Sequence, residues 1–260
     1  MKNDYAKLKA FLDKKVDQYD QPSFIPYDPI CIPHLFKKKQ DIEIAAFFAA
    51  IFAWCNRTTI IRKSTELMKA MDMAPHEFIL NHQEKDLRKL LDFKHRTFNA
   101  TDLLYFVDFF KHHYATNKTL ETAFTRGMKK GDTDMDNALV GFQQYFFSLE
   151  EVPARTLKHI STPQRNSTCK RLNMFLRWMV RKDANGVDFG IWKNIYPSQL
   201  VCPVDVHVAR VAKKFNLLNR KPVDWLAAIE LTEQLRRFDE ADPVKYDFAL
   251  FGLGVVEKYG

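Results

Sequence analysis

The sequence contains little glycine and few cysteines, and it has no long uninterrupted hydrophobic run. Only eight glycines occur among 260 residues, and apolar residues recur at helical spacing along most of the chain. This pattern predicts an all-α protein. Because 46% of the residues are hydrophobic, the chain can bury a sizeable core, as one large domain or two small ones.

The four cysteines, at positions 31, 55, 169 and 202, lie far apart in the sequence. They form no C-x2-C pair and no Cys/His cluster, which argues against a zinc knuckle, an iron–sulfur cluster or another metal site. Their number and spacing fit a reducing cytoplasm.

The sequence also has no segment that is typical of a signal peptide or a membrane span. Residues 1–5 lack an apolar signal core, and the longest apolar run, residues 42–55, is interrupted by Glu43 and too short to cross a bilayer. We therefore expect a cytoplasmic protein without membrane contact, and a buried helix over the apolar run.

Apolar periodicity and capping side chains predict most of the helices. They are expected near residues 4–19, 41–55, 59–71, 84–92, 100–115, 118–128, 134–148, 223–238 and 243–258, with one more that follows a turn at Pro163 and runs to about residue 182. Prolines 22, 26, 29 and 33 predict an extended connector. Residues 183–202 are expected to form a loop, and a loop of this length in a compact helical protein indicates a function. Pro203 is expected to open the next helix.

Positive charge is concentrated in one part of the chain. Residues 161–220 contain eleven Lys or Arg and three Asp, a net charge of +8 that equals the formal charge of the whole chain. Such a concentration is typical of a protein that binds a polyanion, and a phosphate backbone is the expected partner. A solvated basic face without a ligand remains the alternative.

Two residues in this basic region have side chains suited to catalysis. Lys170 is expected in the first turn of its helix, where the positive end of the helix dipole favours the neutral, nucleophilic amine. Asp205 lies at or near the start of another helix, flanked by valines. Each also has a structural interpretation, Lys170 as a surface lysine and Asp205 as a helix cap.

The stretch Pro203-Val204-Asp205-Val206-His207 resembles the signature of the helix-hairpin-helix DNA glycosylases, most closely the 8-oxoguanine DNA glycosylases and including their archaeal branch. Residues 204–211 also approximate the V-D-T-H-V-x-R-V run of the endonuclease III-like members. The resemblance is sharp over about 161–217 and 242–254. It implies a two-lobed fold with a cleft between the lobes, with one lobe from about residues 40–175 and the other from 1–39 plus 203–260.

The resemblance also implies roles for individual residues. Lys170 would attack the deoxyribose of an everted nucleotide, Asp205 would assist, and a Schiff base would permit strand cleavage. Asp247 would contact the base edge and Phe251 would stack on the base, with Tyr246 and Trp178 beside them. Ordinary core packing explains Phe251 and Trp178 equally, and a helix-surface charge explains Asp247.

DNA-binding roles follow for further residues of the same stretches. Contacts with DNA are expected from Arg165, Asn166, Ser167, Thr168, Arg171, His207 and Arg210, and from Asn56 and Arg57, which follow the apolar run. A packed or capping role for His207, and a solvated loop at positions 56–57, remain alternatives. The chain departs from the family at the hairpin, because residues 162–167 lack the glycines of the usual L-P-G-x-G motif.

The sequence thus predicts a DNA glycosylase with AP lyase activity that excises an oxidised purine, with 8-oxoguanine as the expected base. The partner would be double-stranded DNA with a damaged base, no cofactor is implied, and we expect a nucleoid-associated monomer. Three alternatives stay open: a non-catalytic helix-hairpin-helix DNA-binding protein, a monofunctional glycosylase for another lesion, and a helical RNA-processing protein.

Overall fold

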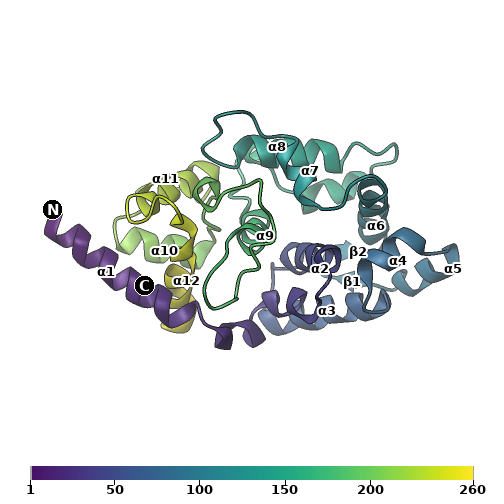
Figure 1. Cartoon of the computed structure of the whole chain (residues 1–260), viewed down its shortest axis with the longest axis horizontal. Coiled ribbons are helices and arrows are strands. Elements are labelled where there is room, and N and C mark those ends of the chain that lie inside the picture. The colour runs from purple at the N-terminus through teal and green to yellow at the C-terminus, as the bar shows by residue number, and fades with distance from the viewer. Residues whose placement is uncertain (1, 260) are drawn as a thin grey trace. The chain divides into compact units, whose positions relative to one another are not determined.

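The computed structural model describes residues 2–259, and its regular structure is almost entirely helical (Figure 1). The expectation of an all-α protein is confirmed, since the described residues add only one two-stranded hairpin to the helices. The chain folds into two compact units. Unit 1 combines the chain up to Phe24, Lys129–Asp136 and the chain from Thr162 onward, and unit 2 combines Ile25–Met128 and Asn137–Ser161.

Unit 2 is built around a helix that is buried on all sides. Its α-helices and strands are α2 (Lys39–Ile51), α3 (Arg57–Ala70), α4 (Pro75–Asn81), α5 (Glu84–Leu87), β1 (Lys94–His95), β2 (Phe98–Asn99), α6 (Ala100–Tyr114), α7 (Glu121–Thr125) and α8 (Asp136–Phe146), whose first residue is assigned to unit 1. Every residue from Asp41 to Ile51 is buried, because α2 has aromatic neighbours on several sides. The Phe47 ring, for example, lies 5.4 Å from Phe110 and 5.7 Å from Phe142.

Unit 1 contains α1 (Lys2–Tyr19), α9 (Lys170–Val180), α10 (Val206–Lys214), α11 (Trp225–Arg236) and α12 (Tyr246–Phe251), which continues into a π-helix, Gly252–Val256. Helix α1 lies beside α12 (Figure 1). A Cβ on Gly252 would lie 2.2 Å from the Tyr19 ring, so only glycine fits there. The Tyr246 hydroxyl donates to Asp13 Oδ1 at 2.7 Å, which joins the same two helices.

The prediction of an extended connector between Pro22 and Pro33 is wrong. The segment forms three short 3₁₀ helices, Pro22–Tyr27, Pro29–Cys31 and Pro33–Leu35. Each begins with a proline, whose fixed φ and missing N–H suit the first position of a helical turn. The prolines therefore start these turns and do not prevent them.

The structure also differs from the sequence prediction before α10, at α4 and at the β1–β2 hairpin. Pro203 does not open a helix, because residues up to Val204 are irregular and α10 begins at Val206. Helix α4 and the β1–β2 hairpin were not predicted. The long loop after α9 folds back on that helix, with the N–H groups of Phe189 and Trp192 bonded to the carbonyls of Trp178 and Met179.

The two units differ in their boundaries from the lobes expected from the resemblance. The hairpin at Pro163 and Lys170 belong to unit 1, not to a lobe that spans residues 40–175, and residues 25–39 belong to unit 2. None of the helices described in residues 2–259 is both long enough and apolar enough to span a membrane.

Candidate active site

The hairpin that precedes α9 adopts its sharp turns without glycine. A single 3₁₀ turn, Pro163–Arg165, follows Thr162, and Asn166 then takes a left-handed conformation with φ 53°. Cys169 is also left-handed, with φ 51°, and its N–H donates to Ser167 Oγ at 3.1 Å. These two turns direct the chain into α9, so that Lys170 is the first residue of the helix, and its side chain is 27% exposed.

Asp205 caps α10. Its Oδ1 atom accepts hydrogen bonds from the N–H groups of His207 at 2.9 Å and Val208 at 3.0 Å. The chain before it, from Leu200 to Val204, is buried, so the carboxylate is held at a fixed place while remaining 20% exposed. The capping role suggested by the sequence is therefore present, and it uses only one of the two carboxylate oxygens.

The second oxygen of Asp205 faces Lys170. The Lys170 Nζ and Asp205 Oδ2 atoms are 3.2 Å apart. Burial acts to raise the pKa of Asp205, but the Lys170 amine and the two capping N–H groups outweigh it, so the pKa lies below its ordinary value. Asp205 is thus ionised at neutral pH and lies within hydrogen-bonding distance of the Lys170 amine. Both side chains are partly exposed to solvent.

The DNA-binding residues predicted in unit 1 lie on the segments that carry this pair. Arg165, Asn166, His207 and Arg210 are exposed, and Ser167, Thr168 and Arg171 are partly buried. The Arg210 guanidinium donates to the Gly254 carbonyl at 2.9 Å, which ties α10 to the π-helix. Burial lowers the pKa of Arg171 to about 10, so it stays charged at neutral pH.

Asn56 and Arg57 belong to unit 2 and lie where α3 begins. Asn56 is exposed and caps that helix, with Oδ1 accepting from the Thr59 N–H at 2.9 Å. Arg57, the first helical residue, is partly buried.

The residues expected to line a base pocket differ in their exposure to solvent. Tyr246 and Trp178 are fully buried, so the structure places them in the core, where neither lines an open pocket. Phe251 is partly exposed, and its ring lies edge-on to Phe24 at 6.4 Å. Asp247 is 6% exposed and forms a buried ion pair with Arg177, so in this structure its carboxylate is bound to an arginine.

A buried ionic network that no sequence pattern indicates adjoins the candidate pair. Arg177 lies seven residues after Lys170, which puts both on nearly the same side of α9, and it binds Asp247 and Asp188. Burial raises the pKa of Asp247 to about 6, although Arg177 opposes this. Asp205 and Lys170 also act on that pKa, so the network and the pair are electrostatically coupled.

Arg181 extends the network one turn further along the chain. Its guanidinium donates to Asp188 at 3.0 Å, to Asp20 at 2.9 Å and to Asp242 at 2.8 Å. Burial raises the pKa of Asp188 to about 6. The spacing of Lys170, Arg177 and Arg181 on one helix was the sequence signal for this network, but nothing in the sequence indicated which carboxylates they would meet.

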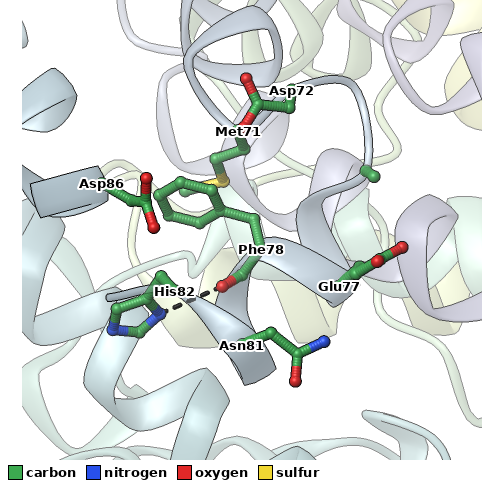
Figure 2. Close-up of a pocket in the computed structure, with 8 residues that line it drawn as sticks. Met71, Asp72, Glu77, Phe78, Asn81, His82 and Asp86 are labelled. Carbon is green, nitrogen blue, oxygen red and sulfur yellow. Dashed lines mark hydrogen bonds between the residues drawn. The ribbon is translucent and has the colours of Figure 1, made fainter. Parts of the chain in front are cut away.

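A pocket of about 310 Å³ lies elsewhere, in unit 2 (Figure 2). Its lining includes the carboxylates of Asp72, Glu77 and Asp86 around Phe78, and His82 Nδ1 lies 3.1 Å from the Phe78 carbonyl oxygen. None of the predicted site residues lines it, and its acidic side chains do not suit a polyanion. Within residues 2–259, no group of three or more His, Cys, Asp or Glu side chains is arranged to hold a metal ion.

Comparison with known proteins identifies one family. Residues 28–256 match the model of the family described as "Protein of unknown function (DUF2400)", and this match includes both Lys170 and Asp205. No curated protein and no solved structure matches the chain.

Proposed function

We propose that this chain, which belongs to the DUF2400 family, is a DNA glycosylase with AP lyase activity that excises an oxidised purine, 8-oxoguanine, from duplex DNA. The observation that carries the proposal is the 3.2 Å approach of Lys170 Nζ to Asp205 Oδ2. These are the residues that the resemblance to helix-hairpin-helix glycosylases assigns to catalysis.

The pair has the chemistry that the reaction requires. Lys170 transfers a proton to Asp205, and its neutral amine attacks C1′ of an everted nucleoside. The new C–N bond forms as the glycosidic bond breaks, and the base leaves with that electron pair and is protonated. The adduct opens to a Schiff base, and loss of a proton from C2′ then expels the 3′-phosphate. Asp205 gives the proton that it received from Lys170 to the departing base, and the regenerated carboxylate then stabilises the positive charge of the Schiff base.

The hairpin supports the same proposal. In the family motif L-P-G-x-G, the last glycine stands three residues after the proline, and here that position is Asn166. Asn166 has φ 53°, and asparagine is among the non-glycine residues that adopt this conformation most readily. A hairpin without glycine can therefore still make the turn that directs Lys170 into the start of α9.

The charge around the pair suits a DNA substrate. Arg165 and Arg210 are exposed on the two segments that carry Lys170 and Asp205, and both helices present their N-terminal ends there. Guanidinium groups and helix N-termini both bind phosphate groups.

Borohydride trapping tests the proposal. Incubation with a duplex that contains 8-oxoguanine, followed by reduction with borohydride, should yield a covalent protein–DNA adduct. Lys170→Gln should abolish the adduct, and Asp205→Asn should reduce it strongly. The matched control is Lys221→Gln, which removes one exposed positive charge from the same unit and should leave the adduct intact.

Three outcomes would overturn this assignment. If 8-oxoguanine, uracil and abasic duplexes all give no adduct and no base release, the chain is a non-catalytic DNA-binding protein. If Lys170→Gln still releases the base but Asp205→Asn does not, the enzyme is a monofunctional glycosylase. If the adduct persists in Lys170→Gln, another amine is the nucleophile.

A further inference from the structure

The tip of the β1–β2 hairpin in unit 2 holds an arginine in an unfavourable backbone conformation. His95 pairs with Phe98, so Arg96 and Thr97 form a two-residue turn. Arg96 has φ 54°, in the left-handed region that favours glycine, and its side chain is exposed. Non-glycine residues held in this conformation cluster at functional sites, which makes the Arg96 side chain a candidate for a binding role.

The Arg96 guanidinium is fixed at the surface by Trp54, the third residue after α2. Its Nη1 atom donates to the Trp54 carbonyl at 3.0 Å, and its Cζ atom lies 5.0 Å from the centre of the Trp54 ring. Figure 1 shows β1 and β2 beside α2, which leads into this segment. A guanidinium has five N–H donors, so this bond leaves it able to bind an anion as well.

A second guanidinium supports the same turn. Arg155 Nη2 donates to the Thr97 carbonyl at 2.6 Å, and the Arg155 side chain is 40% exposed. The buried carboxylate of Asp102 lies 3.2 Å from the same nitrogen and orients it. Two arginines therefore flank one turn, each held by a backbone carbonyl, and neither needs to be ordered when a ligand arrives.

The charge of this region is mainly positive. Burial lowers the pKa of His95, and Lys63, Arg96 and Arg62 lower it further, so these cations lie close together. Glu66 pairs with Lys63 at 2.5 Å and with Arg62 at 3.8 Å. Arg57 lies three residues after Trp54 and adds to the charge.

We propose that this region of unit 2 binds the phosphodiester backbone of DNA. We call it the Trp54 surface, and it consists of Trp54, Asn56, Arg57, Arg96 and Arg155. Arg96 uses Nη1 for its bond to Trp54, so its Nε and Nη2 atoms can donate to two phosphate oxygens. Arg155 adds positive charge beside the same turn. The choice of DNA as the polyanion rests on the proposed function of the chain, whereas the surface itself belongs to unit 2 alone.

Equilibrium binding of an undamaged duplex by the Lys170→Gln protein, in which no adduct forms, tests this surface. Adding Arg96→Gly should weaken binding about eightfold near 0.1 M salt and reduce the slope of log K against log salt concentration by about 0.9, as expected for one lost phosphate contact. The melting temperature should change little, because the relief of strain at φ 54° offsets the loss of the hydrogen bond to Trp54.

The matched control is Lys118→Gln in the same Lys170→Gln background. Lys118 is exposed and follows the C-terminal end of α6, whereas the hairpin precedes the N-terminal end, and 15 helical residues separate them. This variant should bind DNA within about twofold of its parent. If Arg96→Gly binds as Lys118→Gln does, or if the parent binds RNA of the same sequence more tightly than duplex DNA, the proposal is wrong.

The two proposals fail separately. A wild-type adduct together with normal binding by Arg96→Gly would overturn only the Trp54 surface. Binding that depends on Arg96, without adduct or base release on any lesion, would overturn only the glycosylase assignment.

Discussion

Gly254 packs directly against the backbone of His207. A Cβ at position 254 would lie 3.1 Å from the His207 carbonyl oxygen and 3.3 Å from its carbonyl carbon. Both are backbone atoms, so the start of α10 would have to move by a few tenths of an ångström. Because the His207 N–H also binds Asp205 Oδ1, this contact sets where the carboxylate lies relative to Lys170.

Gly254→Ala should therefore slow adduct formation about tenfold, since small displacements of reacting groups are costly, while duplex binding changes little. Single-turnover trapping and anisotropy measure the two effects. The control is Val256→Ala in the same π-helix, at a side chain that is 60% exposed, which should leave both unchanged. Wild-type rates in Gly254→Ala would contradict the role of this contact.

The two functions of Asp205 can be separated by substitution. Asparagine is as good an N-cap as aspartate, so Asp205→Asn should lose only the stabilisation that comes from the charge, whereas Asp205→Ala should lose about 1 kcal/mol more because it also loses the cap. Both variants should form much less of the covalent protein–DNA adduct than wild type. Urea unfolding of the three proteins at pH 7 measures the difference. Equal destabilisation by both variants would mean that the charge pair with Lys170, and not the cap, dominates stability.

The same residue has a pH signature. Its pKa is lower in the folded protein than in the unfolded chain, where it is about 3.9. The charge of Asp205 therefore stabilises the fold above that value, and the stabilisation is lost as the pH falls through the folded pKa. The free energy of unfolding of wild type relative to Asp205→Asn should fall below about pH 4. A difference that stays constant down to acidic pH would contradict this.

The buried carboxylate of Asp247 should have the opposite pH dependence. Its pKa is raised to about 6, so between about pH 4 and 6 the folded protein holds a proton that the unfolded chain releases. This contribution to stability is present below about pH 4 and is lost as the pH rises to about 6. Asp247→Asn removes the titration, so its stability relative to wild type should increase over that interval.

Urea unfolding of Asp247→Asn and wild type at a series of pH values measures this effect. Asp92→Asn, at an exposed position of unit 2, serves as the control for loss of a carboxylate. A difference between Asp247→Asn and wild type that does not vary with pH would show that the Asp247 carboxylate is ionised throughout.

The Tyr246 hydroxyl should matter for folding and not for DNA. It is buried and donates to Asp13 Oδ1, so Tyr246→Phe removes a hydrogen bond to a charged group and should cost about 2 kcal/mol. Tyr27→Phe, at a side chain that is 74% exposed, should cost nothing. Unfolding curves measure the cost. A selective loss of lesion binding in Tyr246→Phe would instead restore a base-pocket role for this residue.

Local patterns predicted the helices, and the exceptions have local causes. All residues from Asp41 to Ile51 of α2 are buried, so the hydrophobicity of the apolar run alone predicts this helix. The β1–β2 hairpin was missed because its turn, Arg96–Thr97, lacks the Asn-Gly or Gly residues that signal such turns. The prolines from Pro22 to Pro33 predict an extended connector, although proline is also well suited to start a 3₁₀ turn.

The residues of the candidate site could be proposed only because a family resemblance adds what spacing does not give. Lys170 and Asp205 were chosen from motifs, and their approach depends on how α9 and α10 pack. The Arg177–Asp247 ion pair joins residues 70 positions apart, and no periodicity relates them. Charged residues read from a sequence are assigned to the surface, so a buried ionic network is visible only after the fold is known.

The hydrogen bonds of Asp205 make its side chain less mobile than that of Lys170. Two backbone N–H groups hold one carboxylate oxygen, so this side chain is immobilised as part of the helix start. Lys170 carries its amine on four methylene groups and a single ion pair. A ligand that drew the amine away from Asp205 would therefore move the lysine side chain and leave the carboxylate in its place.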